Sequence, residues 1–88
     1  MTSDYSKIDS LPLMGLRITS LISGHVFLRK MTNLKELNLS NNRIVTPSHL
    51  NELKGLHSLI LAHNRIEEIN NLNLPILSYL NLDRNKIT

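Results

Sequence analysis

Leucine and isoleucine recur along the chain at a spacing that no single helix face explains. In residues 34–44, LKELNLSNNRI, leucines stand at offsets of three and then two, and a pair of asparagines and an isoleucine follow. At 100° per residue, Leu34, Leu37 and Leu39 would be spread around a helix and would form no stripe. In an extended segment Leu37 and Leu39 share one face, so the pattern predicts a short strand over residues 36–40.

The same spacing occurs three more times, which makes the chain a set of repeats. Exact copies of Leu-x-x-Leu-x-Leu-x-x-Asn-x-Ile start at Leu34, Leu56 and Leu77, and a weaker copy starts at Ile8, with Leu16 in the asparagine position. The later copies predict strands over 58–62 and 79–83. We expect one domain over residues 1–88, with an N-terminal segment 1–7 and repeats 8–33, 34–55, 56–76 and a partial 77–88.

This pattern resembles the leucine-rich repeat, and the resemblance covers residues 8–88. The period and the Asn-x-Ile ending are similar to the short-repeat intracellular subfamily typified by a regulatory subunit of protein phosphatase 1. The spliceosomal A-prime protein and a dynein light chain with leucine-rich repeats belong to the same group. The resemblance implies an α/β fold: a right-handed solenoid with a short parallel β-sheet on its concave face, and turns, 3₁₀ and short helices on its convex face.

Stacked repeats give the asparagine position a physical role. A sharp turn after each strand would leave backbone N–H and C=O groups buried without strand partners, which is costly. A side-chain amide both donates and accepts hydrogen bonds, so Asn42, Asn64 and Asn85 can satisfy those groups. We expect the three side chains to form a ladder that Leu16 interrupts in the first repeat.

The segments between the strands predict turns and short helices. Residues 46–55, TPSHLNELKG, place Thr46 at a helix N-cap, Pro47 at the first helical position and Gly55 just past the end. They predict one or two helical turns, with Leu50 and Leu53 facing the core. Two further predictions are a short helix over 25–31 that buries Val26, Phe27 and Met31, and turns or 3₁₀ over 67–75 with Ile69 and Leu72 inward.

Composition and charge exclude several classes of protein. The 88 residues include no cysteine, so there is no disulfide framework and no thiolate metal site. The N-terminus lacks the apolar run of a secretory signal, and no stretch approaches the length of a membrane span. The net charge of +3 is spread thinly, which argues against direct nucleic-acid binding. These features predict an intracellular protein, cytoplasmic or nuclear, that contacts no membrane.

No constellation of residues points to catalysis. His25, His49, His57 and His63 fall at unrelated repeat positions, without an HExxH motif or carboxylates at metal-ligand spacing. The glycines form no phosphate loop, and no serine stands in a nucleophile elbow. We therefore expect no enzyme activity, no catalytic residue, no cofactor, no metal and no small-molecule substrate.

The resemblance implies that the concave face binds another protein. Alternation along the strands places Ser10, Pro12 and Met14 on that face, together with the hypothesised partner-binding residues: Glu36, Asn38, Ser40, Ser58, Ile60, Ala62, Tyr79, Asn81 and Asp83. Exposed Ile60 and Tyr79 would be the anchors, with Glu36 and Asp83 as acidic edges. The alternative is that these are ordinary outward side chains of a scaffold.

The residue between the asparagine and isoleucine positions is always basic: Arg17, Arg43, Arg65 and Lys86. Stacking would line these side chains up along one rim. The simpler interpretation is that their long stems cover the aliphatic layer beneath. Recognition of an acidic partner or a phosphate is the alternative, and strongly salt-dependent binding would favour it.

The fourth repeat stops directly after Ile87, which would leave Leu77, Leu80, Leu82 and Ile87 facing water on one side. We expect this end to belong to a longer array, or to dock or self-associate. The predicted function is a non-catalytic protein–protein interaction module. The alternatives are a regulatory-subunit-like fragment of a larger leucine-rich-repeat protein, such as a phosphatase regulator, or a structural component of a spliceosomal or axonemal assembly.

Overall fold

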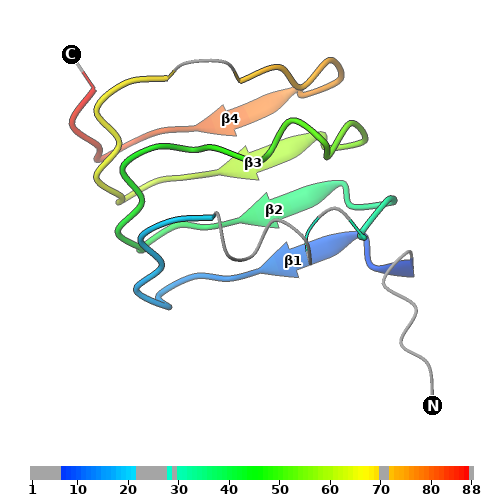
Figure 1. Cartoon of the computed structure of the whole chain (residues 1–88), viewed down its shortest axis with the longest axis horizontal. Coiled ribbons are helices and arrows are strands. Elements are labelled where there is room, and N and C mark those ends of the chain that lie inside the picture. The colour runs from blue at the N-terminus through cyan, green and yellow to red at the C-terminus, as the bar shows by residue number, and fades with distance from the viewer. Residues whose placement is uncertain (1–6, 22–27, 29, 70–71, 88) are drawn as a thin grey trace.

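The computed structural model describes residues 7–21, 28, 30–69 and 72–87, and these contain one parallel sheet (Figure 1). Its strands are β1 (Ser10–Pro12), β2 (Glu36–Asn38), β3 (Ser58–Ile60) and β4 (Tyr79–Asn81). Each strand pairs with the next one in the chain, in the order β1-β2-β3-β4. This order follows from a repeat of nearly constant length. Each repeat contributes one strand, and the chain then returns to the starting end of that strand, where the next parallel strand begins.

The register of the sheet matches the spacing of the leucines. The middle residues of the strands are partners across the sheet, from Leu11 through Leu37 and Leu59 to Leu80. The predicted strands 36–40, 58–62 and 79–83 are correct in place but two residues too long. Backbone hydrogen bonds do continue past the strands, as from Leu39 N to Ile60 O at 2.8 Å. Three residues beyond each of these strands, however, the backbone turns to a positive φ and ends the extended conformation.

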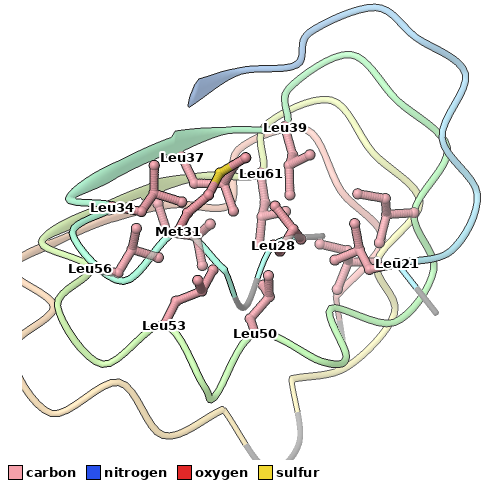
Figure 2. Packing of buried hydrophobic residues seen from close by; sticks show 13 residues of the cluster. Leu21, Leu28, Met31, Leu34, Leu37, Leu39, Leu50, Leu53, Leu56 and Leu61 are labelled. Atoms are coloured by element: carbon pink, nitrogen blue, oxygen red, sulfur yellow. The ribbon is translucent and has the colours of Figure 1, made fainter. Parts of the chain in front are cut away.

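The core lies between the sheet and the return segments, where leucines of successive repeats meet (Figure 2). Repeats two and three contribute nine side chains that are at most 1% exposed: Leu34, Leu37, Leu39, Ile44, Leu50, Leu56, Leu59, Leu61 and Ile66. The equivalent of Leu59 in the fourth repeat, Leu80, is 39% exposed. A repeat therefore buries its leucines only between two neighbours, as expected for stacked repeats.

The helix predicted over 46–55 is wrong. The segment is a series of bends and turns, with i→i+3 hydrogen bonds from Leu53 N to Leu50 O at 3.0 Å and from Leu56 N to Leu53 O at 3.1 Å. His49 has a φ of 64°, so the right-handed helical conformation cannot continue from Pro47 to Leu50. Turns also cover more distance per residue than the roughly 1.5 Å of a helix, which suits a short return to the next strand. The predicted burial of Leu50 and Leu53 is nevertheless confirmed.

The other return segments agree with the sequence where they are described. Met31 is buried as predicted, whereas Val26, Phe27 and most of the predicted helix 25–31 lie outside the described residues. Ile69 and Leu72 are partly buried and pack against the core, and a turn at residues 75–76 leads into β4. Among the described residues, no helix has the length and hydropathy needed to cross a membrane.

Candidate protein-interaction face

The asparagine ladder holds the turns that follow the strands, and it is present as predicted. Asn64 Nδ2 donates to Leu39 O and Leu61 O, each at 3.0 Å, and to Ala62 O at 3.3 Å. Its Oδ1 accepts a hydrogen bond from Ile44 N at 3.0 Å. The side chain therefore joins its own repeat to the preceding one through four backbone groups.

The flanking asparagines make equivalent contacts. Asn42 Oδ1 accepts from Leu16 N at 3.0 Å and Ile18 N at 2.9 Å, and its Nδ2 donates to Leu13 O at 2.9 Å. Asn85 Oδ1 accepts from Ile66 N at 3.0 Å, and its Nδ2 donates to Leu61 O at 2.9 Å. Asn42 and Asn64 are buried, and no buried side-chain N or O atom among the described residues lacks a partner. The turns are thus fixed relative to the sheet.

Each turn also contains a residue in the left-handed backbone region, directly before the ladder position. The φ values are 68° for Gly15, 57° for Asn41, 56° for His63 and 60° for Arg84. Glycine adopts this region freely, and asparagine and histidine are enriched in it, whereas arginine is not. Sequence reasoning missed this recurring geometry of the four turns, since the four residues are of different types. The turn, rather than the residue type, imposes the conformation on Arg84.

The sheet face that points away from the core carries two rows of side chains, and we call it the open face. One row runs across the strands as Ser10, Glu36, Ser58 and Tyr79, and the second as Pro12, Asn38, Ile60 and Asn81. Parallel pairing in register brings these residues together from distant parts of the chain. All eight side chains are exposed or half-buried, and Tyr79 is 52% exposed.

A hollow of about 270 Å³ lies on the open face over β1, β2 and β3. Four of the predicted partner-binding residues, Glu36, Asn38, Ser58 and Ile60, line it together with Ser10, Pro12 and Leu37. Ser10 Oγ donates to Glu36 Oε2 at 3.5 Å, so the carboxylate has a neighbour on the first strand. The hollow combines an apolar side, Pro12 and Ile60, with a polar side that carries hydroxyls and a carboxylate.

Two asparagines on this face are held in one orientation by their own turns. Asn38 Oδ1 accepts hydrogen bonds from Ser40 N at 3.1 Å and from Ser40 Oγ at 2.8 Å. Asn81 Oδ1 accepts from Asp83 N at 2.9 Å, and its Nδ2 donates to Tyr79 Oη at 3.4 Å. Because the oxygen of each amide is engaged, the Nδ2 group is the part directed away from the turn.

The predicted site residues beyond the strand ends differ in how much of their side chains is exposed to a partner. Ser40 is half-buried and its hydroxyl donates to Asn38, so it positions that amide. Asp83 is exposed. Ala62, at the same position of the third repeat, is only 8% exposed. Ala62 thus presents little surface to a partner.

The histidines form no metal site in the described part of the chain. His49, His57 and His63 are exposed, and His25 lies outside the described residues. No group of three or more His, Cys, Asp or Glu side chains there is arranged to hold a metal ion.

This geometry defines a class: a protein of stacked strand-and-turn repeats joined by an asparagine ladder. Residues 32–73 match the family described as leucine rich repeats, in two copies. The chain is a leucine-rich-repeat protein. Domains of this family generally mediate protein–protein interactions.

Two known proteins are similar to this chain. It is 30% identical over 95 residues to acidic leucine-rich nuclear phosphoprotein 32 family member A of Drosophila melanogaster, covering 99% of this chain and 35% of the relative. It is 41% identical over 63 residues to a probable serine/threonine-protein kinase of Dictyostelium discoideum, covering 67% of this chain and 5% of the kinase. The chain thus spans about a third of the first relative's length and a twentieth of the second's.

Proposed function

We propose that this chain is a non-catalytic interaction module that binds an extended segment of a protein partner across the open face, which would be concave. The observation that carries the proposal is the row Pro12, Asn38, Ile60 and Asn81, in which apolar and amide side chains alternate from strand to strand. Extended segments expose backbone carbonyls and side chains in alternation, so such a row offers both kinds of partner.

The hollow supports one aliphatic side chain of the partner. Pro12 and Ile60 supply its apolar side, and about 270 Å³ is enough space for a single side chain rather than a folded element. Asn38 Nδ2 lies beside the hollow with its orientation fixed by Ser40, so it can donate to a partner carbonyl without losing side-chain freedom on binding. Tyr79, at the far end of the face, is the aromatic anchor of the proposed contact.

The test compares two substitutions of equal chemistry on different faces. Ile60→Glu places a charge on the open face, whereas Ile76→Glu places the same charge on an exposed return segment. Both variants and the wild type, each checked for folding by circular dichroism, are immobilised and exposed to the same cell extract. Captured proteins are quantified by mass spectrometry.

We expect a partner that the wild type and Ile76→Glu retain and that Ile60→Glu loses, and Tyr79→Ala should weaken the same partner. A partner retained equally by all of the variants would move the interaction off the open face. The outcome separates a binding face from a scaffold surface, because both isoleucine variants change the net charge by the same amount.

We extend the proposal to the handedness, the location and the lack of kinase activity of the protein. The repeats wind in a right-handed sense, because crossovers between neighbouring parallel strands are right-handed in nearly all proteins. The protein acts inside the cell, since the Drosophila relative is named as a nuclear phosphoprotein. No kinase activity is carried over from the Dictyostelium relative, because 63 aligned residues are far fewer than a catalytic domain needs.

A further inference from the structure

A column of basic side chains lies in the turns that follow the carboxyl ends of the four strands. Arg17, Arg43, Arg65 and Lys86, which we call the basic edge, are all exposed. The backbone N–H of Arg43 donates to Ile18 O at 2.8 Å, and Arg65 and Lys86 each donate to the isoleucine of the preceding repeat at 2.9 Å. The side chains of Arg43, Arg65 and Lys86 therefore start from a backbone held in register, about 4.8 Å from one repeat to the next. Arg17 occupies the same repeat position, with a φ of 59°. In Figure 1 the turns that carry them follow the arrowheads of the strands on the same side.

Positive charge is spread thinly along the sequence, but the fold brings much of it together in these turns. The turns at residues 14–18, 40–44, 62–66 and 83–87 contain five of the nine described Lys and Arg side chains, since Arg84 adds to the four of the basic edge. They contain one of the six described Asp and Glu side chains, Asp83. The rest of the described chain is nearly balanced, so the net charge of the molecule is mostly the charge of these turns.

Covering the aliphatic layer does not account for this charge. Ile44 and Ile66 beneath the turns are fully buried, and a long stem of any kind would help to shield them. Four cations at the spacing of the repeats repel one another, which an uncharged long side chain would avoid. No carboxylate of the described residues pairs with the basic edge. The column is therefore suited to an external anion with several charges in a line.

The neighbours of the basic edge indicate the class of that anion. Leu16, beside Arg17, is 57% exposed, and Val45, two residues after Arg43, is 44% exposed. Tyr79 is the single aromatic side chain of the described residues and lies on the open face, so this edge has no aromatic platform for stacking bases. We propose that the basic edge binds an acidic protein segment in which Asp or Glu residues are interspersed with aliphatic ones.

The test measures binding of a fluorescein-labelled peptide built from repeated Glu-Glu-Leu units, with a single-stranded oligouridine of equal charge as the competing class of ligand. Two double variants remove the same charge from different places. Arg43→Gln with Arg65→Gln changes the basic edge, and Lys35→Gln with Lys54→Gln changes exposed lysines elsewhere. Affinities are measured by fluorescence anisotropy at about 50 mM and about 200 mM salt.

We expect the wild type to bind the peptide more tightly than the oligouridine, with affinity that falls as salt rises. The basic-edge variant should bind the peptide about fivefold more weakly, the effect of losing two exposed ion pairs, and the lysine variant should stay within about twofold. No measurable peptide binding, equal losses in both double variants, or tighter binding of the oligouridine would each overturn the proposal. Tyr79→Ala should leave peptide affinity unchanged, which keeps this test separate from that of the open face.

Discussion

Removing Asn64 should destabilise the protein more than removing any other described asparagine of the third or fourth repeat. Asn64→Ala deletes four hydrogen bonds at a site that is only 7% exposed. The carbonyls of Leu39 and Leu61 keep a second donor, because Asn42 Nδ2 and Asn85 Nδ2 also reach them at 2.9 Å. Ile44 N is different, since Asn64 Oδ1 at 3.0 Å is its partner in a fully buried place.

These contacts determine how much stability Asn64→Ala should remove. A buried N–H left without a partner costs about 1–3 kcal/mol, and the weakened carbonyl contacts add a smaller amount. We therefore expect Asn64→Ala to lower the free energy of unfolding by about 3 kcal/mol. A domain of this length is stabilised by roughly 4–13 kcal/mol in total, so the loss is a large fraction. Asn85→Ala removes equivalent bonds at a half-buried site where water can replace them, and should cost about 1 kcal/mol.

Urea denaturation followed by circular dichroism measures these differences. Asn73→Ala is the control, because the Asn73 side chain is exposed and only its backbone N–H is bonded, to Asn51 Oδ1 at 2.7 Å. The expected order of destabilisation is Asn64, then Asn85, with Asn73 near zero. Equal costs for Asn64→Ala and Asn85→Ala, or a cost for Asn64→Ala below about 1 kcal/mol, would contradict the assignment of a buried ladder.

Three further substitutions probe the turns and the core. Gly15→Ala should destabilise the protein by about 1 kcal/mol because the φ of Gly15 is 68°, even though no atom lies within 4 Å of the added Cβ. Gly55 lacks a positive φ, so Gly55→Ala should be neutral or slightly stabilising. Thermal denaturation measures both effects. Leu59→Ala should cost about 2–5 kcal/mol and Leu80→Ala about 1 kcal/mol in urea denaturation, because the first is fully buried and the second 39% exposed. Asn64→Asp should place a carboxylate among three carbonyl oxygens, which raises its pKa above the ordinary value. The variant should then be most stable below the unfolded-state pKa and lose stability as pH rises from that value through the raised folded-state pKa, and a flat difference from wild type between pH 3 and 7 would contradict this.

The spacing of a few aliphatic residues is enough to predict the sheet. Leu37 and Leu59 fix the inward face, and their equal distance from the repeat starts fixes the register with Leu11 and Leu80. The ladder is also predictable, because a side-chain amide is the group that can both donate and accept at a buried turn. These features repeat, so each copy supports the interpretation of the others.

Features that depend on distance along the chain are harder to predict. Thr46 and Pro47 are good helix-start signals, but such signals are local and carry no information about the span that the return segment must cover. Arg84 has no preference for a positive φ, so its residue type gives no sign of its conformation. The alternation places Ile60 on the open face, but Ala62, two residues later and beyond the end of β3, is buried.

Within each repeat, buried residues stabilise the fold and exposed residues are available for binding, so stability and binding should respond to different substitutions. The ladder residue Asn64 contacts backbone groups of two repeats and has almost no exposed surface. Its neighbour Arg65 attaches to the preceding repeat through its backbone N–H alone, so its side chain is available without any loss to the turn. Ile60 and Tyr79 likewise owe their positions to backbone pairing rather than to their side chains. Exposed side chains of the open face and of the basic edge can therefore change with little effect on folding. A substitution that alters affinity but leaves the urea midpoint unchanged thus identifies a binding residue.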